Sequence, residues 1–146
     1  MRIRKAAAAA CVVLSACSSM TTMRTVQEGA TVDVKESKQH VSPRTEEFGD
    51  TSFGNYEFCA RLPQQEPFYG VLPLEFHGGY LALDILFFAP ATFFNLRGVF
   101  PYYEFDTEKH ELRYREKETD SWVTYRPTED EVAHAKKYFE KRTPPC

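Results

Sequence analysis

The four cysteines are the residues of this chain whose positions point most directly to chemistry. They are Cys11, Cys17, Cys59 and Cys146. A cysteine thiolate can act as a nucleophile, ligate a metal ion or form a disulfide, and its surroundings decide which of these it does. No two cysteines have the C-x-x-C spacing of a redox or zinc pair. Cys17 directly follows a run of small and aliphatic residues, so it is the first candidate for a nucleophilic role.

The residues ahead of Cys17 have the composition of a secretory signal. Arg2, Arg4 and Lys5 supply three positive charges, and the uncharged run 6–16 behind them is 11 residues long. This run is too short to cross a bilayer, which takes about 20 apolar residues. An Ala-rich run also favours a helix of a soluble domain, but this one is apolar all round and begins at the chain start. A basic start followed by a short apolar run is typical of an export signal that is later removed.

The last residues of this stretch, Leu14-Ser15-Ala16-Cys17, resemble the lipobox of bacterial lipoproteins. The resemblance implies that the chain is cut between Ala16 and Cys17 and that the Cys17 thiol carries a diacylglycerol. Ser18 at the next position resembles an outer-membrane address facing the periplasm. Acyl chains would then anchor the protein in the membrane, since each buried methylene contributes about 0.8 kcal/mol. An ordinary secretory signal that is cut elsewhere is the alternative.

Two cysteines remain once Cys11 leaves with the signal and Cys17 carries lipid. In the oxidising compartments of the cell envelope, the remaining Cys59 and Cys146 are expected to form a disulfide. This bond would close a loop of 88 residues and fasten the last residue, which follows two prolines, to the domain. A redox or metal-binding pair is the alternative, which the missing C-x-x-C spacing disfavours.

Other catalytic and metal-binding patterns are missing from the sequence. There is no G-x-S-x-G elbow, no P-loop, no G-x-G-x-x-G and no H-E-x-x-H. Glu131 and His134 form one Glu-x-x-His step, whereas carboxylate-bridged metal sites use two such steps on facing helices. We therefore expect no catalytic residue, no metal site and no cofactor, and we expect that the protein is not an enzyme.

The charge and the composition of the chain exclude further classes of function. The formal net charge is −3, and it becomes −6 without residues 1–16, because that segment holds three positive and no negative charges. An acidic body is poorly suited to binding nucleic acid or an anionic lipid surface. The 12 Phe and 8 Tyr residues can build a core, which a disordered chain lacks. We therefore expect a folded domain with no nucleic-acid partner.

Alternation of apolar and polar residues predicts a series of strands. The runs are 30–35, 56–62, 71–77, 80–88, 102–106, 111–116 and 121–126. Gly78-Gly79 predicts a hairpin between the third and fourth runs, because both glycines tolerate positive φ. A second hairpin around 107–110 would place Tyr103 and Phe105 across from Leu112 and Tyr114. The charged residues on the other face of this hairpin are either cross-strand ion pairs or a contact surface for another envelope protein.

Two helices are expected beside these strands. Thr128 and Glu131 have the spacing of a capping box and predict a C-terminal helix. Pro90 suits the first turn of a short internal helix that would end with Arg97 before Gly98. The predicted fold class is α+β, with a mostly antiparallel sheet of five to seven strands, a short internal helix and a C-terminal helix.

The expected organisation is a signal peptide at 1–16, a lipidated tether at 17–24 and a single globular domain at 25–146. The tether is predicted because residues 18–24 are small and polar. Residues 37–55 are rich in Ser, Pro, Gly, Asp and Asn, and this composition predicts a loop.

Residues 80–100 hold a concentration of apolar side chains that includes Phe87, Phe88, Phe93 and Phe94. The longest uncharged run here, 85–96, has 12 residues and is too short to span a membrane. The four phenylalanines belong either to the domain core or to an exposed surface that contacts a partner, the bilayer or a ligand.

Parts of the chain resemble small bacterial lipoproteins of the YceK/YidQ type. Tyr69-Gly70-Val71 and Leu83-Asp84-Ile85 echo the pattern of that family, although Leu86 stands where the family has a proline. The resemblance implies an envelope lipoprotein and implies no activity.

These observations lead to one functional hypothesis and one alternative. The hypothesis is a membrane-anchored envelope lipoprotein with a non-catalytic structural or accessory role through contacts with another envelope protein. The alternative is a periplasmic ligand-binding or inhibitor-like module with an apolar pocket lined by the phenylalanines.

Overall fold

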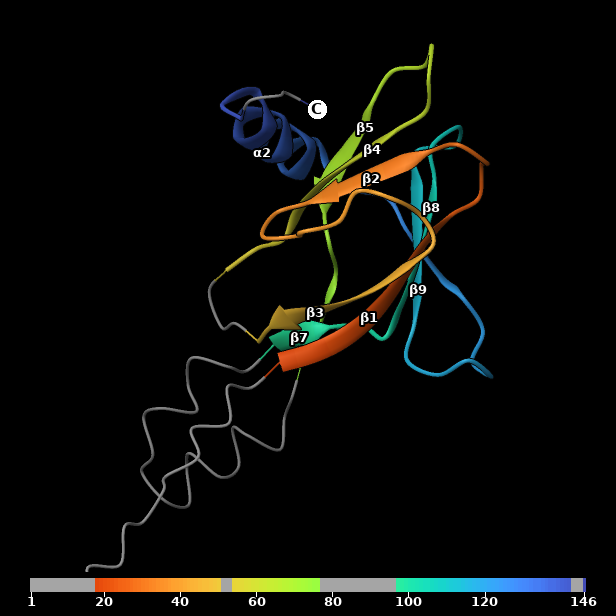
Figure 1. Cartoon of the computed structure of the whole chain (residues 1–146). Coiled ribbons are helices and arrows are strands. Elements are labelled where there is room, and N and C mark those ends of the chain that lie inside the picture. Colours follow the sequence, from red (N-terminus) through yellow and green to blue (C-terminus); the bar gives the residue numbers. More distant parts are fainter. Residues whose placement is uncertain (1–17, 51–53, 77–96, 143–145) are drawn as a thin grey trace, which may run out of the picture.

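The computed structural model describes residues 18–50, 54–76, 97–142 and Cys146, which form ten strands and one helix (Figure 1). The strands are β1 (Ser18–Thr25), β2 (Thr31–Val34), β3 (Arg44–Gly49), β4 (Glu57–Arg61), β5 (Phe68–Val71), β6 (Leu74–Phe76), β7 (Arg97–Val99), β8 (Tyr102–Asp106), β9 (Glu111–Arg115) and β10 (Val123–Tyr125). The helix is α2 (Glu129–Glu140). A β-rich chain with a C-terminal helix confirms the predicted α+β class.

The strands form three sheets rather than one. A five-stranded sheet has the order β10-β9-β8-β1-β3, a three-stranded sheet has the order β2-β4-β5, and β6 pairs with β7. Neighbouring strands are antiparallel except for β1 and β8, which are parallel. The described strands therefore exceed the five to seven that the sequence predicts.

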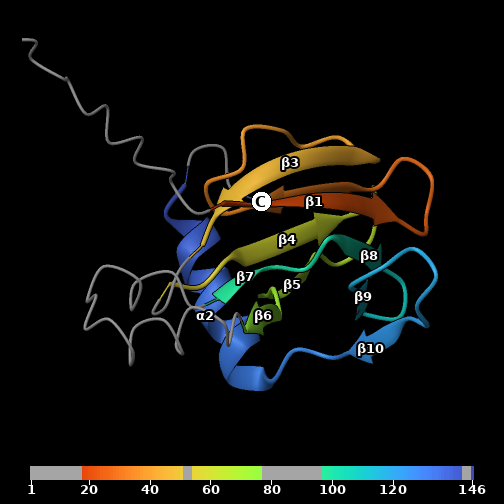
Figure 2. The same cartoon turned by 90° about the horizontal axis from the view of Figure 1, so that it is seen from below.

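The core lies between the five-stranded and the three-stranded sheet. Phe58 of β4 is fully buried and packs edge-on against Phe68 at 5.0 Å and Phe105 at 5.1 Å between ring centroids. Helix α2 packs on the opposite side of the three-stranded sheet, against β4 and β5, and buries Ala135 and Phe139 (Figures 1 and 2). The fold thus has three layers, in the order helix, small sheet, large sheet.

The predicted tether at 17–24 is wrong for its described part, because residues 18–25 form β1. This strand pairs with β3 on one side and with β8 on the other, so it lies inside the large sheet. Its side chains alternate, with Thr21 and Met23 buried and Met20 and Arg24 exposed. Residues 18–24 therefore belong to the folded domain, which the sequence predicts to begin only at residue 25.

Two further predictions fail for related reasons. Residues 44–49, inside the predicted loop 37–55, form β3 because they complete the edge of the large sheet beside β1. Arg97 does not end a helix: it begins β7, and Arg97–Val99 pairs with Leu74–Phe76 of β6. The described partner of β6 is thus β7, whereas the predicted partner 80–88 and residues 90–96 lie outside the described residues.

The local patterns of the C-terminal half are confirmed. In the β8–β9 hairpin Tyr103 lies opposite Tyr114 and Phe105 lies opposite Leu112, as the alternation predicts. The N-cap Thr128 accepts a hydrogen bond from the backbone N–H of Glu131, and the Glu131 carboxylate accepts one from the Thr128 N–H. Both are short-range signals, which explains why the sequence alone suffices to predict them.

A buried arginine connects β3 to the small sheet. The Arg44 guanidinium donates to the carbonyl oxygens of Val32 at 2.8 Å and Val41 at 3.2 Å, and it pairs with Glu46 at 3.3 Å. Burial lowers the pKa of Arg44 from its usual value, while the Glu46 carboxylate opposes this shift. These bonds hold the β2–β3 connection against both sheets.

The end of the parallel β1–β8 pair is fastened by a buried polar network. Gln27 donates to the Asp106 carboxylate at 2.8 Å, and its amide oxygen accepts from Thr107 Oγ1 at 2.8 Å. Asp106 also accepts from the backbone N–H of Lys109 at 3.1 Å. Burial acts to raise the pKa of Asp106, but the hydrogen bonds from Gln27 and Lys109 outweigh it, so that this pKa lies below its usual value.

This network predicts a pH-dependent effect of Asp106→Asn. A carboxylate with a depressed pKa contributes stability above its unfolded pKa of about 4, and the contribution is lost as the pH falls through the folded pKa. We expect the variant to lose about 1–2 kcal/mol of unfolding free energy at pH 7 and less at pH 3. Urea unfolding at the two pH values measures this, with Glu108→Gln in the same turn as control. A deficit equal at both pH values would contradict the expectation.

Candidate functional site

The predicted site residues fall into two groups. Cys59 and Cys146 are described, whereas Ala16, Cys17 and the four phenylalanines Phe87, Phe88, Phe93 and Phe94 lie outside the described residues. The structure joins Cys59 and Cys146 as a disulfide, with 6.4 Å between their Cα atoms, inside the usual range for this bond. Cys59 is fully buried in β4 on the side of the sheet that faces α2. The bond therefore fixes Cys146 to the small sheet, as predicted.

The two ends that flank residues 77–96 lie near the start of the domain. Ser18 lies opposite Gly49 at the edge of the large sheet, and Phe76 lies opposite Arg97 in the β6–β7 pair. Arg97 donates to the carbonyl oxygen of Gly54 at 3.2 Å, and β7 contacts both β1 and β3. The start of β1, the end of β3 and β7 thus gather at one end of the molecule (Figure 1).

The side of the large sheet that faces away from the core is the main candidate for a contact surface, and we call it the open face. Helix α2 packs on the other sheet, and Met20 on the open face is 60% exposed. Its side chains form two rows across the strands. The first row is Thr45, Thr22, Tyr102 and Arg115; the second is Arg24, Glu104 and Arg113.

The second row is a network of ion pairs centred on one carboxylate. Glu104 pairs with Arg24 at 2.6 Å and with Arg113 at 2.5 Å, so it joins β1, β8 and β9. Both arginines are partly exposed, and the strength of such a pair in water is modest. The cross-strand pair between Glu104 and Arg113 is one of those that the alternation predicts.

An aromatic and arginine cluster covers one end of the first row. The Arg115 guanidinium lies 4.3 Å from the Trp122 ring centroid and 5.2 Å from that of Tyr102, and Arg24 lies 5.1 Å from Trp122. These are cation–π distances. The cluster borders a hollow of about 100 Å³ that also includes Thr22 and Glu118. Sequence reasoning missed this cluster, because Arg24 falls in the predicted tether.

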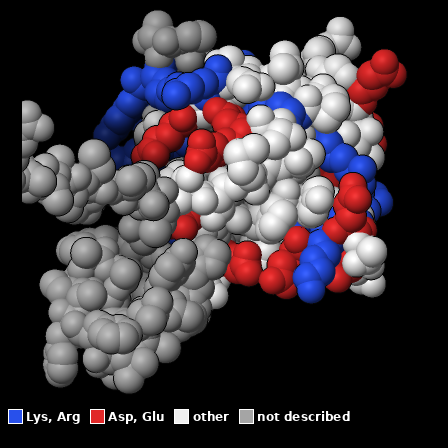
Figure 3. All heavy atoms as spheres, turned by 60° about the horizontal axis from the view of Figure 1, so that its bottom comes forward, with Lys and Arg blue, Asp and Glu red and all other residues white. Residues whose placement is uncertain are grey.

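Charges of both signs lie on the face of the molecule that Figure 3 views. Figure 3 shows acidic and basic residues interspersed around uncharged surface on the face that it views, with no broad area of one sign. Such a pattern suits a protein partner with matching charges of both signs better than a polyanion.

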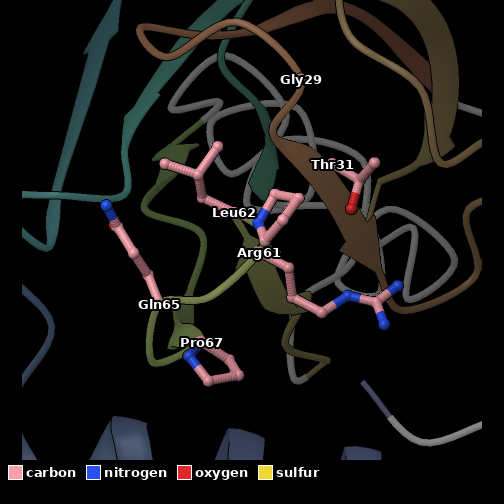
Figure 4. Close-up of a pocket in the computed structure, with 7 residues that line it drawn as sticks. Gly29, Thr31, Arg61, Leu62, Gln65 and Pro67 are labelled. Atoms are coloured by element: carbon pink, nitrogen blue, oxygen red, sulfur yellow. The ribbon is translucent and has the colours of Figure 1, made fainter.

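Figure 4 shows a surface pocket at the start of β2 and the end of β4. It has a volume of about 260 Å³ and is lined by Gly29, Thr31, Arg61, Leu62, Pro63, Gln65 and Pro67. Arg61 and Gln65 point away from each other in Figure 4, and Arg61 pairs with Asp33 at 3.0 Å. Its polar groups therefore do not converge on a ligand. The predicted apolar pocket beside the phenylalanines lies outside the described residues.

The side chains of the Glu-x-x-His step in α2, Glu131 and His134, contact different partners. Glu131 accepts hydrogen bonds from the Tyr125 hydroxyl at 2.6 Å and from the Thr128 N–H at 2.7 Å. Burial and the bond to Glu131 raise the pKa of Tyr125. His134 instead places its Nδ1 atom 3.2 Å from a carboxylate oxygen of Glu57 in β4. Within residues 18–50, 54–76 and 97–142, no three His, Cys, Asp or Glu side chains gather as metal ligands would.

The described helix is too short and too polar to cross a lipid bilayer. In comparisons with known proteins, no family model, no curated protein and no solved structure matches this chain.

Proposed function

We propose that this protein is a lipid-anchored lipoprotein of the bacterial cell envelope that acts through contact with another envelope protein and catalyses no reaction. The lipobox residues 14–17 support acylation at Cys17, and Ser18 supports a place on the outer membrane, facing the periplasm. The observation that carries the partner role is the open face, where Trp122 lies between two arginines. The few residues that carry most of the binding energy at protein interfaces are enriched in tryptophan, tyrosine and arginine.

The start of β1 at Ser18 adds a geometric argument. With lipid on Cys17, no spacer separates the acyl chains from the large sheet, so the domain would lie directly at the membrane surface. An extended strand rises about 3.3 Å per residue, and the open face would therefore lie within a few nanometres of the bilayer. The partner is accordingly a protein embedded in, or bound to, the same membrane.

This proposal predicts a large effect of Trp122→Ala on partner binding. Truncating an interface hot spot costs about 2 kcal/mol or more, which weakens binding roughly thirtyfold. We expect amine-reactive crosslinking in native envelopes to yield a partner adduct with the unaltered protein and a strongly reduced adduct with the variant. Quantitative mass spectrometry gives the ratio of adduct formed by the variant to adduct formed by the unaltered protein.

Val41→Ala is the matched control for this experiment. Val41 is 64% exposed and lies in the β2–β3 connection rather than in a strand of the large sheet, so its truncation also removes exposed apolar surface. The control is expected to retain the adduct. Equal losses in both variants, or an adduct that Trp122→Ala leaves unchanged, would contradict a contact through the open face.

A further inference from the structure

A second pocket lies between helix α2 and the small sheet, away from the open face. It has a volume of about 260 Å³ and is lined by Lys35, Glu57, His134, Lys137, Tyr138 and Lys141. Four of these six side chains are lysine or histidine. His134, Lys137 and Tyr138 lie on one face of α2, and the C-cap residue Lys141 follows them at the same helical spacing. The pocket thus collects nitrogen donors from α2 and its C-cap and from Lys35, the residue that follows β2.

Glu57 positions two of these donors. Its side chain is buried, with only 1% of the residue exposed, and one carboxylate oxygen lies 3.2 Å from His134 Nδ1. The other oxygen lies 3.1 Å from Lys35 Nζ, at an angle that makes an ion pair but no aligned hydrogen bond. The Lys35 ammonium also lies 5.4 Å from the ring centroid of Tyr138. Lys35 and His134 are therefore held at the pocket before any ligand arrives.

Lys137 and Lys141 line the same pocket without an ion pair to any of the described residues. Three lysines and one carboxylate give the pocket a formal charge of +2 when His134 is neutral. Lysines near a helix C-terminus also complement the helix dipole. The helix dipole explains why Lys137 and Lys141 lie near the end of α2. It does not explain why they line the same pocket as Lys35 and His134.

We propose that this pocket binds a phosphate monoester group. Such a group carries a charge of about −1.5 to −2 at pH 7, which matches the charge of the pocket, whereas a single carboxylate carries only −1. Lysine binds phosphate as a point charge, and each ammonium can donate to a phosphate oxygen. Lys137 and Lys141 would make the main contacts, with Lys35 and the Nε2 side of His134 completing the site.

The test titrates inorganic phosphate into the purified mature protein in detergent micelles at constant ionic strength. The NMR signals of the His134 imidazole report occupancy of the pocket. We expect a saturable shift with the unaltered protein. A hydrogen bond to a charged group contributes about 1.5–3 kcal/mol, so each lysine that is removed should weaken phosphate binding by a factor of about ten or more. The double variant K137Q/K141Q loses two such bonds and should bind phosphate correspondingly more weakly.

K109Q/K117Q is the matched control, since it removes the same net charge from exposed turns outside the pocket. Lysine and glutamine have similar helix propensities, so the double variant in α2 should fold normally, which circular dichroism verifies. A shift that does not saturate, or an equal loss of affinity in the control, would overturn the proposal.

Two further arms distinguish the source of the phosphate group. Glycerol 1-phosphate represents a small soluble ester, and vesicles of phosphatidylcholine with phosphatidic acid present the same group as a lipid headgroup. If glycerol 1-phosphate competes with inorganic phosphate and the vesicles do not, the pocket binds a soluble ligand. If the protein binds phosphatidic acid vesicles more tightly than glycerol 1-phosphate, and K137Q/K141Q loses this binding, the pocket binds a lipid headgroup.

Discussion

Replacement of Cys17 by serine is expected to remove the protein from the membrane. Serine lacks the thiol that receives the diacylglycerol, so the variant should incorporate no labelled palmitate. A single myristoyl chain already supplies a membrane binding constant of about 10⁴ M⁻¹, and several chains bind far more tightly. The variant should therefore move from the membrane fraction to the precursor or soluble fraction, which fractionation and labelling measure together.

Cys11→Ser is the matched control, because Cys11 lies in the same apolar run but precedes the predicted cleavage site. This variant should keep both its palmitate label and its membrane fraction. Palmitate incorporation that persists in Cys17→Ser would refute the lipobox assignment and, with it, the proposed anchor.

Loss of the Cys59–Cys146 disulfide is expected to have the largest effect on stability. The two cysteines are separated by 87 positions, and closing a loop of that length contributes about 4–5 kcal/mol in the chain-entropy model, with measured values of about 2–5 kcal/mol. Cys146→Ser is the variant of choice, since it leaves the buried Cys59 in place as a small apolar side chain. Urea unfolding should show a matching fall in unfolding free energy.

Reductant supplies the control for this measurement. It should destabilise the unaltered protein to the level of Cys146→Ser and leave the variant unchanged. If the oxidised protein and the variant unfolded at the same urea concentration, the bond would contribute nothing to stability, contrary to this expectation.

The sequence predicts the parts of the fold that depend on neighbouring residues. The Thr128–Glu131 capping box and the β8–β9 hairpin each rest on contacts between residues close in sequence, and both are confirmed. The disulfide is long-range, but it could be predicted because assigning the other two cysteines leaves one possible pair.

The sequence misses β1 and β3 because their pairing is non-local. Residues 18–24 are small and polar, and their strand state depends on β8, whose first residue follows Thr22 by 80 positions. β3 likewise forms because β1 offers it an antiparallel partner. Composition favours tether and loop at these positions, and tertiary pairing overrides it.

The same limit applies to the candidate sites. Arg24, Arg115 and Trp122 come together only once β1 lies beside β8. Glu57 and His134 are 77 positions apart and meet only because α2 packs on β4. Neither group has a local motif that reveals it in the sequence.

The most direct test of the proposed partner role places a photoreactive amino acid at one position of the native, lipid-anchored protein. Met20 on the open face and Val41 in the β2–β3 connection are 60% and 64% exposed, so they form a matched pair. After irradiation of intact cells, we predict a discrete envelope-protein adduct from position 20 and none from position 41. Adducts from position 41 alone, or the same adducts from both positions, would contradict a partner contact through the open face.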